Sequence, residues 1–248
     1  MFISMKKNDF GYKQINKKEH YDLIQNIFTN VASNYDLMND LMSLGLHRSW
    51  KKEFISMVDI ANKDNLSFVD LAGGTGDIAE KLSDKYPNST IRIIDKNIDM
   101  INGGINKINS LKKVQFICGD GENIPISDNS TDLVTVSFGI RNMTDRNRCL
   151  KECYRILKPN GIFLCMEFSM PENYTLRNLY DAWSFLVIPK LGKLINKSEK
   201  SYQYLVESIR TFPRPKEFVE MLKQNNFNKT SIRQLSGNIV CIYKCRKS

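Results

Sequence analysis

The 248-residue chain is poor in metal-binding side chains and has no long hydrophobic run. It contains only two histidines, His20 and His47, and none of its six cysteines forms a C-x-x-C pair, so we expect no zinc or other metal site. Its uninterrupted apolar runs are only a few residues long, too short to span a membrane. Residues 1–20 are polar and lysine-rich and lack the apolar region of a signal peptide. These absences, with scattered cysteines of which Cys118 and Cys165 fall in apolar patterns typical of a core, predict a cytoplasmic protein in a reducing compartment.

Acidic residues are scarce in the last third of the chain. Residues 1–170 carry 22 Lys and Arg against 21 Asp and Glu, whereas residues 171–248 carry 14 against 6, so most of the net charge of +9 lies there. A one-sided basic surface suits an anionic membrane or a nucleic acid. A solvated lysine-rich face is the alternative interpretation of the same charge.

Short apolar runs alternate with helical patterns in the middle of the chain. The expected strands are 68–72, 90–94, 114–118, 132–138 and 162–168. The expected helices between them are 77–85, 98–109 and 145–157. Near-continuous apolar strands separated by helices favour a parallel sheet that is covered on both faces, an α/β fold.

Further helices flank this unit, and a hairpin ends it. The expected flanking helices are 21–31, 36–42, 47–58, an aromatic-rich stretch at 174–210 interrupted by Pro189 and Gly192, and 215–225. Strands at 230–235 and 239–245, around Ser236-Gly237-Asn238, would give the sheet an antiparallel edge and seven strands in all. We expect one domain over residues 1–248, with the helices at 20–60 and 174–210 forming a cap over the substrate.

The most informative motif joins the first of these strands to a glycine turn. Gly73, Gly74 and Gly76 directly follow the strand and precede a helix, which lets the backbone approach a ligand without a Cβ in the way. Asp95 lies 19 residues after Gly76, at the end of the second strand, where an acidic residue holds a ribose in nucleotide-type sites. The motif predicts a nucleoside site, and a purely structural glycine turn is the alternative.

What the glycine motif lacks narrows the choice of nucleoside. Ile78 stands where the third glycine of the dinucleotide pattern would be, and there is no G-x-x-x-x-G-K phosphate loop. Asp70 and Asp77 flank the turn with negative charge, which suits an amino group better than a pyrophosphate. S-adenosyl-L-methionine has a ribose, an adenine and a cationic amino group but no phosphate, so we expect this cofactor.

Two segments after later strands add candidate site residues. Asp120 and Gly121 follow the third strand, where a carboxylate can accept a hydrogen bond from the exocyclic amine of an adenine. An ordinary acidic turn is the alternative interpretation. Ser137 ends the fourth strand and would face the cofactor. Arg141 and Asn142 come next and would lie near the substrate, unless Arg141 is a plain surface residue.

Several motifs together resemble the ubiquinone/menaquinone biosynthesis C-methyltransferase family. They are Asp70–Asp77 (DLAGGTGD), Ser137–Asp145 (SFGIRNMTD), Arg155–Gly161 (RILKPNG), Met166–Pro171 (MEFSMP), Ser201–Arg210 (SYQYLVESIR) and the Tyr35–Asn39 and Leu44–Trp50 segments. The resemblance runs from about residue 20 to the end. It implies a Rossmann-like class I methyltransferase that transfers a methyl group from S-adenosylmethionine to a ring carbon of a polyprenylated benzoquinol or naphthoquinol.

The resemblance also assigns residues. Thr75, Asp95, Asp120, Gly121 and Ser137 match family positions that contact the cofactor, although the family often has Asn-Ala where this chain has Asp120-Gly121. Because a phenol has a pKa near 10, its anion needs a neighbouring cation or base at neutral pH.

Three catalytic candidates follow from this requirement. Arg141 would stabilise the phenolate or orient a water, and Asn142 and Tyr35 would hydrogen-bond the ring oxygens. The basic cap would attach the protein peripherally to the inner face of an anionic membrane. A homodimer and a quinone-synthesis complex both remain open.

Two other functions compete with this interpretation. An RNA or other small-molecule methyltransferase could use the same fold, but Ser137-Phe-Gly-Ile stands where amino-group methyltransferases often carry an Asn/Asp-Pro-Pro-aromatic motif. The sequence also shows no appended RNA-binding module, so we expect no nucleic acid partner. A non-catalytic subunit of a quinone-synthesis complex is the second alternative, against which the intact glycine loop and Asp95 speak.

Overall fold

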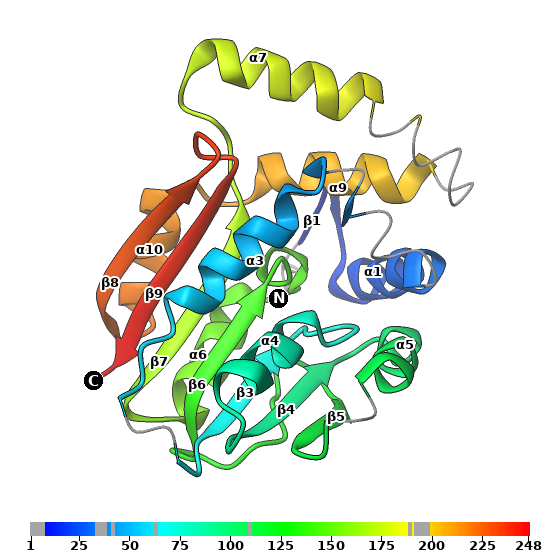
Figure 1. Cartoon of the computed structure of the whole chain (residues 1–248). Helices are drawn as coiled ribbons and strands as arrows, with labels where there is room; N and C mark the ends of the chain where they lie inside the picture. The colour runs from blue at the N-terminus through cyan, green and yellow to red at the C-terminus, as the bar shows by residue number, and fades with distance from the viewer. Residues whose placement is uncertain are drawn as a thin grey trace, which may run out of the picture.

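Seven strands form one sheet in the order β5-β4-β3-β6-β7-β9-β8 (Figure 1). The computed structural model describes residues 8–32, 39–40, 43–61, 64–108, 111–187, 190 and 199–248. The strands are β3 (Ser67–Leu71), β4 (Thr90–Asp95), β5 (Val114–Cys118), β6 (Thr131–Ser137), β7 (Leu157–Phe168), β8 (Phe227–Leu235) and β9 (Val240–Lys247). Those from β3 to β7 pair in parallel, and β9 and β8 pair antiparallel at one edge. The expected parallel sheet with a closing hairpin is confirmed.

Helices cover both faces of this sheet. They are α1 (Lys17–Val31), α3 (Leu46–Ser56), α4 (Asp77–Lys85), α5 (Ile98–Ile108), α6 (Arg146–Ile156), α7 (Tyr174–Ala182), α9 (Glu199–Thr211) and α10 (Pro215–Gln224). A 3-10 turn at Ile140–Asn142 follows β6, and a π-helical turn at Trp183–Val187 follows α7. Most of the expected helix 36–42, along with Tyr35, Pro189 and Gly192, lies outside the described residues.

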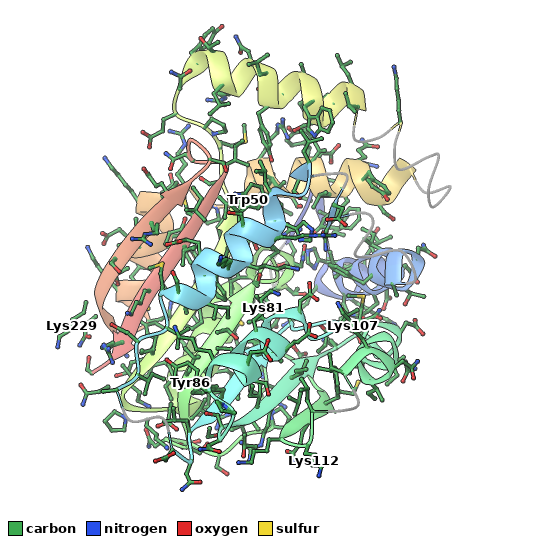
Figure 2. The ribbon with its side chains drawn as sticks, in the orientation of Figure 1. Trp50, Lys81, Tyr86, Lys107, Lys112 and Lys229 are labelled. Atoms are coloured by element: carbon green, nitrogen blue, oxygen red, sulfur yellow. The ribbon has the colours of Figure 1, made fainter. Side chains whose placement is uncertain are left out.

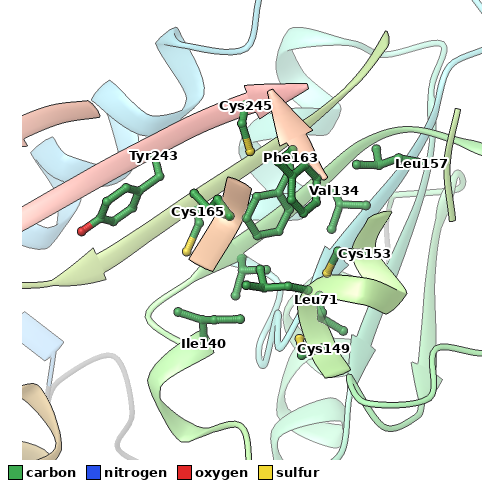
Figure 3. Close-up of a cluster of buried hydrophobic side chains, with 14 of the residues drawn as sticks. Leu71, Val134, Ile140, Cys149, Cys153, Leu157, Phe163, Cys165, Tyr243 and Cys245 are labelled. Atoms are coloured by element: carbon green, nitrogen blue, oxygen red, sulfur yellow. The ribbon is translucent and has the colours of Figure 1, made fainter. Parts of the chain in front are cut away.

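Alternation along the strands divides the core into two layers. On one face, strand residues such as Phe68 pack with α3 and α4; on the other, Leu71 and Phe163 pack with α6 and α10 (Figure 3). Cys165 is fully buried in the second layer, as expected. The expectation for Cys118 is wrong, because it ends the edge strand β5 and is exposed.

Part of the polar N-terminal segment forms regular structure. Strands β1 (Asn8–Phe10) and β2 (Lys13–Ile15) form a small hairpin that turns at Gly11, whose φ is +59°. The hairpin packs on α9, where the Phe10 ring stacks on Tyr204 at a centroid distance of 4.5 Å. An Asn16 cap, whose side chain accepts a hydrogen bond from the Glu19 amide, starts α1 four residues earlier than expected.

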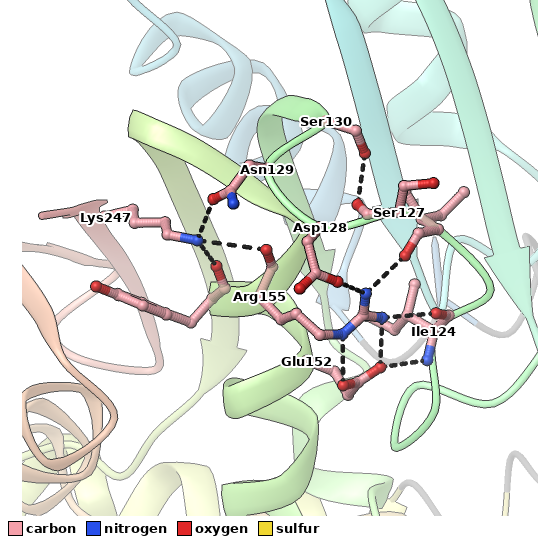
Figure 4. A network of polar contacts seen from close by, with 10 residues as sticks. Ile124, Ser127, Asp128, Asn129, Ser130, Glu152, Arg155 and Lys247 are labelled. Atoms are coloured by element: carbon pink, nitrogen blue, oxygen red, sulfur yellow. Dashed lines mark hydrogen bonds and ion pairs between the residues drawn. The ribbon is translucent and has the colours of Figure 1, made fainter.

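A network of ion pairs and hydrogen bonds around Arg155 holds the loop between β5 and β6 (Figure 4). This loop contains Asp120 and Gly121. Arg155 on α6 donates to the carbonyl of Ile124 at 2.8 Å and pairs with Glu152 at 2.8 Å. Glu152 in turn accepts from the Ile124 amide at 2.8 Å. The carboxylates of Glu152 and then Asp128 raise the pKa of Arg155. Together with a hydrogen bond to the Ile126 carbonyl, these contacts fix a loop that has no regular structure of its own.

Candidate active site

The carboxyl ends of the central strands open into one pocket with about 1050 Å³ of empty space, part of it open to solvent. It lies where the chain order of the sheet reverses between β3 and β6, the position at which open α/β sheets bind ligands. Most of the predicted site residues line it: Asp70, Gly73, Gly74, Thr75, Asp95, Asp120, Gly121, Ser137 and Asn142. Gly76 and Arg141 do not line it, and Tyr35 lies outside the described residues.

The glycine turn is shaped by close packing as well as by backbone angle. A Cβ on Gly73 would lie 2.6 Å from Asp70 Oδ2, and one on Gly74, whose φ is +52°, would lie 2.8 Å from Met100 Cε. Gly76 has a φ of +87° and starts α4, and a Cβ there would meet Ile108 at 2.7 Å. At all three positions a side chain would therefore collide with neighbouring residues of the protein, so close packing alone requires glycine there.

Asp95 ties the glycine turn to the beginning of α5. Its Oδ2 accepts a hydrogen bond from the Gly74 amide at 2.9 Å, and its Oδ1 accepts one from the Asn97 amide at 2.8 Å. Burial raises the pKa of Asp95, and these backbone hydrogen bonds act against the rise. The carboxylate is thus held in one orientation at the wall of the pocket, as a ribose-binding acid must be.

Asp70 is a fully buried carboxyl group beneath the turn. The Thr135 hydroxyl donates to its Oδ1 at 2.8 Å, while its Oδ2 has no hydrogen-bond partner among the described residues. Burial raises the pKa of Asp70 to about 7, with the Thr135 hydrogen bond opposing the shift and Asp95 adding to it. Asp70 therefore titrates near neutrality, and a cationic ligand would favour its ionised form.

Asp77 does not present the free negative charge that the sequence predicts. Lys51 Nζ lies 2.6 Å from its Oδ2, and Lys107 Nζ, labelled in Figure 2, lies 2.5 Å from its Oδ1. Burial works against ionisation, but the two ammonium groups outweigh it and lower the pKa of Asp77. Its charge is already balanced, so Asp70 and Asp95 remain as the acids available to the pocket.

Asp120 is likewise paired within the chain. Its Oδ2 accepts from Lys96 Nζ at 2.7 Å, and its Oδ1 accepts from the Glu122 amide at 2.9 Å. Burial opposes ionisation, yet the Lys96 contact lowers the pKa of Asp120. The residue lines the pocket as an ionised acceptor, and its contact with an adenine stays a prediction.

Arg141 lies behind the pocket wall and forms a buried ion pair. Its Nη1 contacts Glu167 Oε1 at 2.7 Å and donates to the Phe138 carbonyl at 2.6 Å. Glu167 is fully buried and also accepts from the Arg141 amide at 3.2 Å. The pair therefore fixes the turn between Phe138 and Asn142 from inside the protein.

Helix α1 covers the pocket, which the sequence did not reveal. Its Tyr21, Ile24 and Phe28 line the pocket, and Lys96 Nζ lies 3.9 Å from the centre of the Tyr21 ring. Asn97 at the start of α5 donates to Thr29 Oγ1 at 3.0 Å and holds the helix in place. The sequence predicts this helix as part of a cap over the substrate, and that role stays a prediction.

The residues present fit S-adenosylmethionine. The turn offers backbone without Cβ atoms, Asp95 offers a fixed carboxylate at the wall, and the near-neutral Asp70 lies below. Ser137 Oγ and Asn142 Nδ2 are buried without hydrogen-bond partners in the described part of the chain, so a ligand has polar atoms to satisfy. Within the same residues there is no metal-binding group of three or more His, Cys, Asp or Glu, and no helix long and apolar enough to cross a membrane.

The whole chain is similar in sequence to one family of methyltransferases. A model described as the ubiE/COQ5 methyltransferase family matches residues 14–247. Proteins named ubiquinone/menaquinone biosynthesis C-methyltransferase UbiE from Rickettsia bellii (strain OSU 85-389) and Rickettsia prowazekii (strain Madrid E) are each 43% identical over 98% of this chain and 100% of their own length.

Solved structures show the same fold at low identity. A SAM-dependent methyltransferase from Thermotoga maritima superposes with a TM-score of 0.66 at 18% identity, covering 91% of this chain and 100% of that one. Phosphoethanolamine N-methyltransferase 2 from Haemonchus contortus, in complex with S-adenosyl-L-methionine, gives a TM-score of 0.60 at 12% identity, covering 80% and 52%.

Proposed function

The chain belongs to the ubiE/COQ5 methyltransferase family, and we propose that it methylates a ring carbon of a polyprenylated benzoquinol or naphthoquinol in ubiquinone or menaquinone biosynthesis. The methyl donor is S-adenosylmethionine, which supplies an electrophilic methyl group when it is bound. The single observation that carries the proposal is the hydrogen bond from the Gly74 amide to Asp95, which joins the turn after β3 to the end of β4 at the wall of the pocket.

The acceptor half of the site is the turn after β6. Ser137 Oγ and Asn142 Nδ2 are polar atoms at the pocket with no partner among the described residues. We propose that Ser137 contacts the cofactor, whereas a hydrogen bond from Asn142 Nδ2 to a ring oxygen would stabilise the phenolate form of the acceptor, which is the better carbon nucleophile. Tyr35, outside the described residues, is proposed as a second contact to the ring oxygens.

Arg141 supports this turn from behind. Its guanidinium is paired with the buried Glu167, so we propose that it acts by fixing the turn, with its positive charge set behind the pocket wall. A guanidinium has only donor groups, so Arg141 is not the group that removes the proton. Proximity and alignment of the acceptor carbon then supply much of the rate enhancement.

The prenyl chain needs an apolar exit, for which α7 and its π-helical turn are the proposed route. This segment lies outermost at the top of Figure 1 and exposes Tyr174, Leu179, Phe185 and Leu186. Some of the C-terminal basic residues are paired, for example Lys244 with Asp59 and Arg210 with Asp181. We therefore propose peripheral membrane contact through the apolar residues of α7 more than through charge.

The test is methyl transfer from labelled S-adenosylmethionine to demethylated benzoquinol and naphthoquinol acceptors with short prenyl tails. Bulk RNA is the competing acceptor in a parallel reaction. We expect label in one or both quinols and none in RNA. Label in RNA alone would replace the proposal with an RNA methyltransferase, and no transfer despite cofactor binding would favour a non-catalytic subunit.

A further inference from the structure

Tyr204 on α9 reaches the turn that carries the acceptor-side residues. Its hydroxyl donates to Asn142 Oδ1 at 3.0 Å, across 62 positions of sequence. Tyr204 is 4% exposed and does not line the pocket, whereas Asn142 does. The two residues therefore connect a buried part of α9 to the pocket through one side-chain amide.

This contact decides which end of the Asn142 amide is left for a ligand. With Oδ1 occupied by the Tyr204 hydroxyl, Nδ2 is the end that remains. That nitrogen is buried and has no hydrogen-bond partner among the described residues. An unmatched buried donor is unfavourable in the absence of a ligand, and such groups recur at sites that await one.

The surroundings of Tyr204 keep its hydroxyl a donor. Phe10 of the N-terminal hairpin stacks on its ring at 4.5 Å with an interplanar angle of 22°. Burial raises the pKa of Tyr204 to about 12, with Arg141 and Arg146 opposing the shift, so the phenol stays protonated at any physiological pH. The protonated hydroxyl can therefore only donate to Asn142 Oδ1, which has no proton of its own to give.

We propose that Tyr204 is a positioning residue: it orients Asn142 so that the amide N–H donates to a ring oxygen of the acceptor. This inference rests on the proposed function. It gives α9 and the β1–β2 hairpin a part in the reaction, although neither lines the pocket. The hydrogen bond to the ring oxygen strengthens as that oxygen gains negative charge, so its loss affects turnover more than cofactor binding.

The experiment compares Tyr204→Phe, Asn142→Ala and the double variant with the wild-type protein. Tyr204→Phe keeps the ring and its stacking on Phe10 and removes only the hydroxyl. Tyr86→Phe is the matched control, since its buried hydroxyl donates to the Val58 carbonyl at 3.0 Å, away from the pocket. For each variant we would measure kcat and KM for the quinol, Kd for S-adenosylmethionine and the melting temperature.

We expect Tyr204→Phe to lower kcat about tenfold, as the loss of one oriented hydrogen bond in the transition state does, with Kd for the cofactor within twofold of wild type. In the Asn142→Ala background the same change should have no further effect on kcat, because the amide it orients is gone. Tyr86→Phe should lower the melting temperature and leave kcat unchanged.

Three results would overturn the inference. They are wild-type kcat in Tyr204→Phe, an equal loss of kcat with and without Asn142, and wild-type kcat in Asn142→Ala, which tests the amide even where Tyr204→Phe does not fold. A wild-type protein that methylates no quinol would instead overturn the proposed function, and the inference with it.

Discussion

Three aspartates around the pocket have different pKa values because their surroundings differ. Asp77 is paired with Lys51 and Lys107, Asp95 accepts two backbone amides, and Asp70 is buried with one oxygen unpaired among the described residues. Their pKa values accordingly shift down for Asp77 and up for the other two. Only Asp70 and Asp95 are placed to respond to a bound cation.

Asp70 should make the ligand-free protein less stable as the pH rises. Its pKa is raised to about 7 in the folded state, above its unfolded value, so its protonated form stabilises the fold below pH 4 and that contribution is lost as the pH rises to about 7. Asp70→Asn mimics the protonated acid. We expect its melting temperature to exceed that of wild type by a margin that grows from pH 5 to pH 8. The corresponding gain in the free energy of unfolding is at most about 4 kcal/mol.

Thermal melts at pH 5, 6.5 and 8 would measure this difference. The exposed Asp84→Asn is the control, for which we expect no trend with pH. A constant offset between Asp70→Asn and wild type across the range would show that Asp70 is ionised throughout.

Asp95 should carry a large share of cofactor affinity. Asp95→Asn keeps the size of the side chain but loses its charge and one acceptor, and charged hydrogen bonds contribute about 1.5–3 kcal/mol each. We expect Kd for S-adenosylmethionine to rise about 10- to 100-fold in calorimetric titrations. An unchanged Kd would place the ribose elsewhere.

The contribution of Arg141 to stability, through its pair with Glu167, should be separable from its contribution to methyl transfer. Arg141→Ala leaves a fully buried carboxylate unpaired, which costs about 3–5 kcal/mol. Arg141→Met combined with Glu167→Gln should recover most of that stability in chemical denaturation while methyl transfer stays low. Wild-type turnover in the stable double variant would show that the arginine only holds the turn.

The proposed membrane contact depends on the exposed apolar residues of helix α7. Leu179→Asp places a charge on its apolar surface, where the wild-type side chain is 65% exposed. We expect co-sedimentation with anionic vesicles to fall severalfold, with little change in melting temperature. Ile105→Asp on α5, also exposed at 44%, is the control and should bind vesicles as wild type does. Equal binding by both variants would contradict a role for α7.

The strands and the glycine turn were predictable because their signals are local. Apolar runs such as 90–94 and the turn after Leu71 lie within short windows of sequence. The β1–β2 hairpin was not predictable, because its residues are polar and its support, the stacking of Phe10 on Tyr204, comes from the distant α9. Asp77 was misjudged for the same reason, since Lys51 and Lys107 reach it only in the folded chain.

Ligand binding should stabilise the molecule as a unit, because the pocket joins α1, the glycine turn, the loop after β5 and the turn after β6. At a concentration of 100 times Kd, S-adenosylmethionine should add about 2.7 kcal/mol. For a chain of this size that corresponds to a rise in melting temperature of about 5–10 °C. Asp95→Asn at the same concentration should show a much smaller rise, and an equal rise would mean that the cofactor binds elsewhere.

The central claim is that this pocket directs a methyl group to a ring carbon of a quinol. The most direct measurement incubates the protein with carbon-13 methyl-labelled S-adenosylmethionine and a demethylated prenyl quinol, and locates the label in the product by NMR. We predict one labelled methyl group bonded to a ring carbon, and at least severalfold less product with Asp95→Asn at limiting cofactor. A label found on a ring oxygen, or on RNA and not on the quinol, would contradict the account.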